Sequence, residues 1–230
     1  MDKAGIMEYT LKNIVKTLKD KGYEVDTKPF KLNVVGIRTD NPINQDKFDD
    51  KLAYFYYDDK GNLQGKVAIG TSDPSTYFLR NPMAPEGTAI LKGGQYKDAY
   101  QLGTHRGKYR ALVQRKDVVV FRDNDRDGYT NLNNKTQTGL FGINIHKASI
   151  KGNIAFIGAD SAGCQVFQNE RDFNEMMRYA EKSAQTHGNK FTYTLIDERD
   201  YIRKRNTWIF IGLISVASIY ISYYLYKKLK

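Results

Sequence analysis

Gly142-Ile-Asn-Ile-His146 is followed along the chain by Ser161-Ala-Gly-Cys-Gln-Val-Phe167, which holds the only cysteine among 230 residues. A lone cysteine cannot form an intramolecular disulfide, so its uses narrow to packing, metal binding or thiolate chemistry. The small residues before Cys164 let the backbone turn sharply, and an apolar strand carries His146 towards it. We therefore predict a fold that brings a cysteine nucleophile, Cys164, to a histidine base, His146. The alternative is a strand histidine beside an inert buried thiol.

Composition limits the classes of protein and partner. With 230 residues and 40% hydrophobic content, the chain can bury one core, or one core plus an appendage. The formal net charge of +10 suits an anionic partner such as nucleic acid, an acidic lipid surface or an anionic cell-wall polymer. Neither a zinc-finger spacing nor an RNP-like aromatic strand accompanies the basic residues, so we do not expect nucleic-acid binding.

The first 27 residues carry apolar side chains at three- and four-residue steps. These side chains are Ile6, Leu11, Ile14, Val15 and Leu18. The spacing predicts a short amphipathic helix within residues 1–27, ending near Gly22 and packing on the main domain. The N-terminus has acid beside base and no apolar run of signal-peptide length, so we expect no cleavable secretion signal.

A mainly β domain is expected over residues 28–196. Runs of strand formers bounded by turn residues predict strands at residues 28–38, 65–71, 110–115, 117–122 and 191–196. The runs at 110–115 and 117–122 are expected to form a hairpin, in an antiparallel assembly. Apolar residues at helical spacing predict a helix over residues 169–188 that covers the sheet.

Two proline-containing loops are expected to be ordered. They lie at Thr71–Pro74 and Asn81–Pro85. Proline fixes its own φ and restricts the residue before it, so such loops hold one shape. Ordered loops of this kind often line clefts.

An acidic stretch follows the predicted strand at residues 117–122. Asp123, Asp125 and Asp127 alternate before Gly128, as in the first half of a calcium loop. The twelfth position of such a loop holds Asn134, an amide, and no helical pattern flanks it, so it is not an EF-hand. An acidic turn in solvent and a weak structural calcium loop both stay open.

The C-terminal part is predicted to anchor the chain in a lipid bilayer. A charged connector at 197–206 precedes twenty residues, 207–226, that contain no Asp, Glu, Lys, Arg or His. A helix of that length spans about 30 Å, close to the hydrocarbon thickness of a bilayer. Aromatic residues flank the span and a basic tail at 227–230 follows it. Basic residues nearly balance across the span, so its orientation is left open.

His146, fourteen intervening residues and then Ser161-x-Gly163-Cys164 resemble the signature of L,D-transpeptidases of the YkuD type, which is His, a similar gap and Ser/Thr-His-Gly-Cys. A Thr-x-x-Pro loop upstream, here Thr71–Pro74, and a helix and strand downstream are arranged as in that family. The resemblance covers residues 30–196 and looks like a divergent branch seen in Bacteroidetes and their phages. It implies a β-sandwich-like L,D-transpeptidase catalytic domain over residues 28–196.

The resemblance also implies a reaction at peptidoglycan. Cys164 would attack a carbonyl of a stem peptide, between an L-centre and a D-centre, and form a thioester acyl-enzyme. His146 would take the thiol proton or hold a thiolate, and backbone amides at Gly163 and Cys164 would stabilise the oxyanion. No metal or cofactor is required. An amine acceptor would give transfer, and water would give peptidase activity.

Two positions depart from the family's pattern. The family's histidine before Gly-Cys is Ala162 here, and the Arg common two residues after the cysteine is Val166. The losses remove polar groups that the family places around the reacting carbonyl and the substrate carboxylate. Candidate replacements for substrate binding are Asn144, Ser161 and Gln165. His105 is expected in a loop and His187 at a helix end, so neither is predicted as a second base.

Three functions stay open for such a chain. They are an L,D-transpeptidase, a membrane-tethered peptidase or phage endolysin with the same Cys-His chemistry, and a catalytically silent wall-binding or virion protein. The predicted location is a single-pass, C-terminally anchored protein of the bacterial inner membrane or of a phage. A wall substrate needs the domain outside the cytoplasm, whereas no N-terminal signal exports it, so the side of the membrane is left open.

Overall fold

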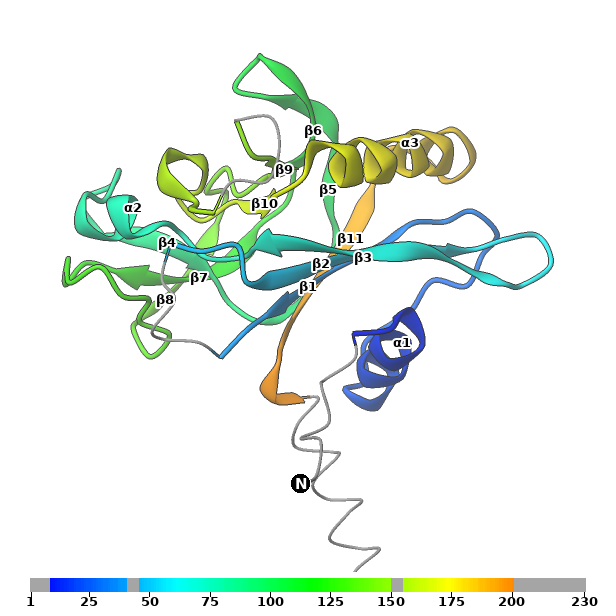
Figure 1. The fold of residues 1–230 in the computed structure, drawn as a ribbon, viewed down its shortest axis with the longest axis horizontal. Coiled ribbons are helices and arrows are strands. Elements are labelled where there is room, and N and C mark those ends of the chain that lie inside the picture. Colours follow the sequence, from blue (N-terminus) through cyan, green and yellow to red (C-terminus); the bar gives the residue numbers. More distant parts are fainter. Residues whose placement is uncertain (1–8, 41–45, 150–154, 201–230) are drawn as a thin grey trace, which may run out of the picture.

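The computed structural model describes residues 9–40, 46–149 and 155–200. These residues form a mainly β fold with a few helices, which confirms the coarse class expected from the sequence. Eight strands close into a barrel and three more form a small sheet (Figure 1). The described residues thus close into a barrel where the resemblance implied a β-sandwich-like arrangement.

The strand order explains this difference. Around the barrel it runs β1 (Asn33–Arg38), β11 (Phe191–Asp197), β5 (Gly94–His105), β6 (Tyr109–Gln114), β9 (Ile145–Lys147), β10 (Gln165–Phe167), β3 (Leu63–Thr71) and β2 (Asp50–Tyr57). Neighbours pair antiparallel, except β1 with β11 and β9 with β10, which pair parallel. Hairpin signals in a sequence reveal antiparallel neighbours, whereas parallel pairs join distant segments. The closing of the sheet into a barrel could therefore not be predicted from the sequence.

The small sheet has the order β4 (Thr88–Leu91), β7 (Val118–Asp123) and β8 (Thr136–Gly139). The predicted hairpin between residues 110–115 and 117–122 is wrong, because β6 pairs with β5 and β9 while β7 pairs with β4 and β8. The hairpin turn lies instead at Arg106 and Gly107, whose φ angles are 49° and 68°. Two consecutive positive φ angles are typical of a type I′ turn, which Lys108 N closes by donating to His105 O at 2.9 Å.

Helix α1 (Leu11–Asp20) confirms the predicted amphipathic helix within the described residues. Thr10 caps it, because its Oγ1 accepts a hydrogen bond from Asn13 N at 3.2 Å. Gly22 follows the helix end with a φ of 75°. Three apolar side chains of the helix pack on the outer face of β1 and β2: Ile14, Val15 and Leu18.

Helix α3 (Glu170–His187) lies where the sequence predicts it, between an Asn169 cap and Gly188. Figure 1 shows α3 and α1 on opposite sides of the strands β1, β2 and β3. The apolar side of α3 joins the barrel core through Phe173, Met176, Met177 and Ala180. In the described residues, the remaining helical elements are the short α2 (Thr76–Arg80) and the 3-10 turn η1 (Gly158–Asp160).

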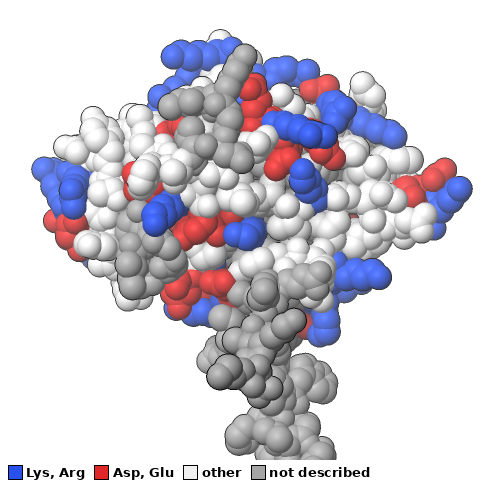
Figure 2. Space-filling view, viewed as in Figure 1, with Lys and Arg blue, Asp and Glu red and all other residues white. Residues whose placement is uncertain are grey.

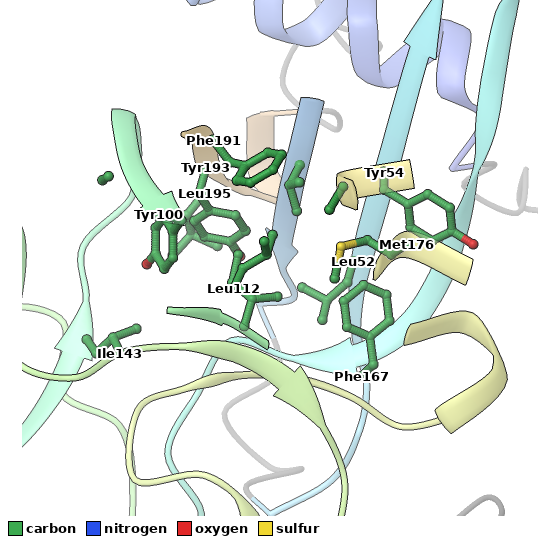
Figure 3. Packing of buried hydrophobic residues seen from close by; sticks show 14 of the residues in the cluster. Leu52, Tyr54, Tyr100, Leu112, Ile143, Phe167, Met176, Phe191, Tyr193 and Leu195 are labelled. Carbon is green, nitrogen blue, oxygen red and sulfur yellow. The ribbon is translucent and has the colours of Figure 1, made fainter. Parts of the chain in front are cut away.

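Large side chains fill the barrel interior. Tyr54, Tyr100, Phe167 and Tyr193 are all fully buried (Figure 3). The rings of Tyr100 and Tyr193 meet edge to face with centroids 5.6 Å apart. This packing fixes the positions of the strands that carry the candidate site.

Several predicted segments lie outside the described residues. They are the start of the N-terminal helix at residues 1–8, most of the charged connector, the membrane span at 207–226 and the basic tail at 227–230. Among the residues that the structure describes, we find no helix with both the length and the apolar character needed to cross a membrane.

The surface charge is mixed on the face that Figure 2 shows. Lys and Arg side chains there are interspersed with Asp and Glu. A clustered basic stripe is the usual footprint of a nucleic-acid partner. On this face the net charge of +10 is not gathered into one such stripe.

Candidate functional site

Strand pairing brings the two predicted catalytic residues together. His146 lies in β9, and Cys164 directly precedes β10. The two strands pair parallel and place His146 opposite Val166. Just before them, Asn144 O accepts a hydrogen bond from Gln165 N at 2.9 Å. As a result, a ring nitrogen of His146 lies within 4.8 Å of Cys164 Sγ. Catalytic contacts are often this loose before a substrate binds.

His146 is held in the tautomer that a general base requires. Its Nδ1 lies 2.7 Å from Lys147 O, an obligatory acceptor, so Nδ1 carries the proton. Tyr109 OH lies 3.1 Å from the same nitrogen and also donates to Lys147 O at 3.3 Å. His146 Nε2 is buried with no hydrogen-bond partner in the described part of the chain. It therefore keeps a free lone pair.

The pKa values of both groups keep them neutral at neutral pH. Burial, with a smaller contribution from the neighbouring His105, lowers the pKa of His146 to about 3. Burial also raises the pKa of the Cys164 thiol, and a hydrogen bond from Asn144 N at 3.5 Å only partly opposes this. The surroundings favour a neutral thiol beside a neutral imidazole, so proton transfer would accompany attack.

A tight turn presents the thiol. Ser161 is fully buried, and its Oγ lies 2.8 Å from Asp73 O and 2.9 Å from Cys164 O. Gly163 N donates to Ser161 Oγ at 3.2 Å. The φ of Gly163 is 120°, and a Cβ there would lie 2.2 Å from Ala89 O, so the turn requires glycine. The predicted oxyanion donor Gly163 N–H is thus already engaged, and we assign Ser161 to support of the turn, not to substrate contact.

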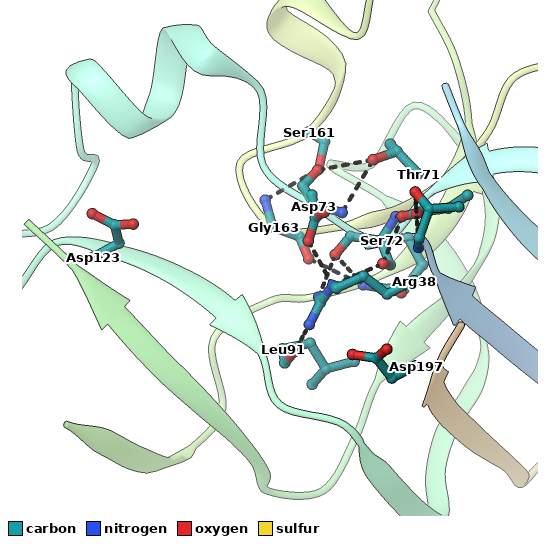
Figure 4. Close-up of polar contacts among 12 residues, drawn as sticks. Arg38, Thr71, Ser72, Asp73, Leu91, Asp123, Ser161, Gly163 and Asp197 are labelled. Atoms are coloured by element: carbon teal, nitrogen blue, oxygen red, sulfur yellow. Dashed lines mark hydrogen bonds and ion pairs between the residues drawn. The ribbon is translucent and has the colours of Figure 1, made fainter. Parts of the chain in front are cut away.

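A buried ion pair fixes the predicted proline loop on which this turn rests (Figure 4). Arg38 is 5% exposed, and its Nε lies 2.7 Å from Asp73 Oδ1. The same guanidinium donates to Ser72 O and to Leu91 O, each at 3.0 Å. A buried cation needs this number of partners to offset its desolvation. Through Asp73, the network reaches Ser161 and holds the cysteine turn against the barrel.

Gln165 points into the barrel core. Tyr193 OH donates to its Oε1 at 2.5 Å, and its Nε2 donates to Gly163 O at 3.3 Å. Its side chain is fully buried. We therefore correct the prediction that Gln165 contacts substrate and assign it to support of the turn. Val166, where the family places Arg, is also fully buried.

His105, which was predicted as a loop residue and not as a second base, lies at the site. The structure places it at the end of β5, not in a loop, and its ring stacks on that of His146 with centroids 4.1 Å apart. Asn144 Nδ2 lies 3.1 Å from His105 Nδ1, so the predicted candidate Asn144 does belong to the site. The signal that could have found His105 is the turn at Arg106 and Gly107, which ends the strand directly after it. His187 ends helix α3, as predicted.

Cys164, His105 and Asn144 line one cavity of about 470 Å³. Ala162 also lies on its wall, as do Met83 and Ala84 from the second predicted proline loop. The charged residues of the wall are Arg106, Arg122 and Asp160. A cavity of this size accommodates a small ligand or a few residues of a peptide.

His105, His146 and Cys164 could be considered as the ligands of a metal site. Ring nitrogens of His105 and His146 and the sulfur of Cys164 lie within 4.8 Å of one another, which is the one such ligand group in the described residues. Zinc needs ligand lone pairs that converge tetrahedrally. The two rings are stacked with planes only 28° apart, so their in-plane lone pairs lie in nearly parallel planes. The arrangement suits acid–base chemistry better than zinc.

Backbone N–H groups donate hydrogen bonds to the carboxylates of the acidic loop, which the sequence offered as a possible calcium site. Asp123 Oδ2 accepts from Asn131 N at 2.8 Å. Asp125 Oδ1 accepts from Asp127 N at 3.2 Å, and Asp127 Oδ1 accepts from Tyr129 N at 2.7 Å. Within the described ranges, these carboxylates do not converge into a metal-binding group. This geometry favours the acidic turn over the weak structural calcium loop.

No family model, curated protein or solved structure matches this chain. The function therefore has to be inferred from the site. Its elements are a buried histidine with a free lone pair, a thiol on a turn that requires glycine and a second histidine on the cavity wall.

Proposed function

We propose that this protein is a cysteine-dependent acyltransferase of the L,D-transpeptidase type that acts on peptidoglycan stem peptides. The observation that carries the proposal is the pairing of Cys164 with His146, whose Nε2 keeps a lone pair. Nucleophile and base need this relation for thiol catalysis. The cavity beside the thiol supplies room for a substrate.

The reaction begins with attack by the thiol. Cys164 Sγ gives its proton to His146 Nε2 and bonds to the carbonyl carbon, while the C=O π electrons move to oxygen. Cys164 N–H, which has no other acceptor among the described residues, donates to this oxyanion. The C–N bond then breaks, His146 returns the proton to the leaving amine, and a thioester remains on Cys164.

The acceptor decides the product. An amine of a second stem peptide attacks the thioester, loses its proton through His146, and forms a crosslink as Cys164 regains its thiol. Water takes the same route and gives a free carboxylate. The first outcome is transpeptidation, and the second makes the protein a peptidase or endolysin. The chemistry requires no metal or cofactor.

The substrate class and the location rest on the sequence. The motif resemblance points to peptidoglycan, and the net charge of +10 suits an anionic wall polymer. The apolar residues 207–226 would anchor the chain in a lipid bilayer as a single-pass protein of the bacterial inner membrane or of a phage. No nucleic-acid partner is proposed.

Mass analysis of purified muropeptides incubated with the detergent-solubilised full chain tests the proposal. We expect new crosslinked products from the wild type, and none from Cys164→Ala or His146→Gln. His187→Gln is the matched control, because His187 ends α3, where its Nε2 bonds Pro29 O at 2.9 Å, and it should keep full activity. Shortened stems without crosslinks would identify the peptidase. Muropeptides left unchanged by the wild type would contradict both catalytic forms and favour a silent wall-binding or virion protein.

A further inference from the structure

The proposed reaction needs a second hydrogen-bond donor for the oxyanion. An oxyanion hole usually combines two or more donors directed at the developing charge. Of the two backbone amides predicted for this role, Gly163 N–H already donates to Ser161 Oγ at 3.2 Å. Ala162, where the family carries histidine, has no polar side chain. A second donor must therefore come from elsewhere on the cavity wall.

A chain of hydrogen bonds fixes the proton of His105. Gln114 N is a backbone donor, and it lies 3.0 Å from Asn144 Oδ1, so this oxygen is the acceptor. The amide orientation follows, and Asn144 Nδ2 donates to His105 Nδ1 at 3.1 Å. Since His105 Nδ1 accepts, the ring proton of the neutral imidazole is on Nε2. His105 Nε2–H is thus a donor that no group in the described part of the chain engages.

His105 lies beside the thiol, on the side of the cavity where a substrate carbonyl would be attacked. It lines the same cavity as Cys164, and one of its ring nitrogens lies within 4.8 Å of the thiol sulfur. Its ring packs flat on His146, which restrains its orientation. Burial and the nearby cations Arg106 and Lys108 lower the pKa of His105, which keeps it a neutral donor at neutral pH.

We infer that His105 is a further catalytic residue, whose Nε2–H donates a hydrogen bond to the tetrahedral oxyanion formed on Cys164. The inference rests on the proposed acyl transfer, and it gives that site a second donor from β5 in place of the Gly163 amide. As the S–C bond forms and the C=O π bond breaks, the negative oxygen meets Cys164 N–H and His105 Nε2–H. The thiol proton stays on His146 until the leaving group takes it. His105 itself neither gains nor loses a proton.

Two probes of the thiol separate this role from a structural one. Iodoacetamide alkylates sulfur by displacement at a saturated carbon and forms no oxyanion. p-Nitrophenyl acetate acylates sulfur through a tetrahedral oxyanion and releases coloured p-nitrophenolate in a burst. The ratio of the acylation rate to the alkylation rate therefore reports oxyanion stabilisation, independently of how much thiolate the site supplies.

Two substitutions separate the stacking ring of His105 from its hydrogen-bond donor. His105→Phe keeps a ring to stack on His146 and removes the donor, whereas His105→Gln keeps an N–H near the Nε2 position and removes the ring. For the detergent-solubilised full chain, we expect the ratio to fall about 100-fold in His105→Phe, as for loss of one oxyanion-hole donor. His105→Gln should recover most of it, and His187→Gln should match the wild type. Melting temperatures show whether each variant is folded.

Equal ratios in the wild type and His105→Phe would overturn the inference. A loss in His105→Gln as large as in His105→Phe would also overturn it, because the ring and not the donor would then matter. The proposed function fails separately, if the wild type is acylated by the ester at Cys164 but converts no muropeptide. If His105→Phe does not fold, the comparison of His105→Gln with His105→Ala decides, since only the former retains a donor.

Discussion

The imidazole rings of His105 and His146 stack with centroids 4.1 Å apart, although strand β6 lies between β5 and β9 in the barrel. The stacked partner helps to cover His146, which is 2% exposed. Burial penalises the charged form of a histidine far more than its neutral form. His146 is therefore uncharged in the resting protein. It does not convert the Cys164 thiol to a thiolate before a substrate binds.

Alkylation of Cys164 should rise steadily with pH. Because burial raises the pKa of the thiol and His146 stays neutral, the thiolate fraction increases about tenfold for each pH unit below that pKa. Iodoacetamide rate constants measured from pH 5 to pH 9 should show no plateau, and His146→Gln should give the same slope. A flat rate between pH 5 and pH 8 would reveal a thiolate–imidazolium pair and contradict the neutral site.

His146 should make the protein less stable in mild acid. Its pKa is about 3 in the folded protein, below the ordinary 6.5 expected when unfolded, so between these values only the unfolded state binds the proton. The free energy of unfolding therefore falls as pH decreases from 6.5 towards 3, by up to about 2 kcal/mol between pH 7.5 and pH 5. Urea unfolding at the two pH values should show this loss in the wild type and a smaller one in His146→Gln.

The comparison of the two proteins isolates His146. Buried carboxyl groups act in the opposite sense, because burial raises the pKa of Asp73 to about 7 and that of Asp49 to about 6. Both proteins share these groups, so their contribution cancels in the difference. An identical pH dependence in the two proteins would show that His146 is not held neutral.

The elements that could be predicted from the sequence are those with a local signal. Helix α3 follows from its apolar spacing and its caps, and β11 follows from alternation. The meeting of His146 and Cys164 was predicted from their motifs. In the structure it depends on the parallel pairing of two three-residue strands, β9 and β10, which carry too few residues for any periodicity.

The turn after His105 marks the end of its strand, but the stacking of His105 on His146 could not be predicted, because it depends on the combined register of β5, β6 and β9. Ser161 and Gln165 were predicted beside substrate because they are polar and adjacent to Cys164. For Gln165 the prediction is wrong, because successive side chains of a strand point to opposite faces and that of Gln165 points to the core. There its Oε1 accepts a hydrogen bond from Tyr193 OH. Closeness to Cys164 in the sequence therefore identified which segment forms the site. Only the fold shows which of its side chains point to the cavity and which to the core.

Asp123→Asn should stabilise the protein at neutral pH. Burial and the neighbouring carboxylates of Asp125 and Asp127 raise the pKa of Asp123 to about 6, above its ordinary value of 3.8. As pH rises through this window the unfolded state loses its proton first, so the charge on Asp123 lowers stability above pH 6. The variant should gain on the order of 1–2 kcal/mol in the free energy of unfolding at pH 7.5 and little near pH 4. A loss at pH 7.5 would contradict the argument.

Calcium chloride should leave the melting temperature of the wild type unchanged. Asp123, Asp125 and Asp127 each accept a backbone N–H, and their oxygens do not converge within the described part of the chain. Anything that binds only the folded state raises its melting temperature, so thermal unfolding with and without the ion is the measurement. A rise in the wild type that Asp123→Asn abolishes would instead establish the calcium loop.

Two glycines near the thiol should respond differently to alanine. At Gly163, φ is 120° and a Cβ would lie 2.2 Å from Ala89 O, so Gly163→Ala must move the turn that carries Cys164. At Gly142, φ is 70° and a Cβ would meet no atom within 4 Å, so Gly142→Ala bears only the strain of a left-handed backbone. We expect losses of about 3 kcal/mol or more for Gly163→Ala and about 1 kcal/mol for Gly142→Ala in the free energy of unfolding. Urea unfolding measures both, and iodoacetamide rates should change mainly in Gly163→Ala. Equal losses in the free energy of unfolding would mean that the turn at Gly163 can move at little cost. Such a turn would not hold the thiol in position beside His146.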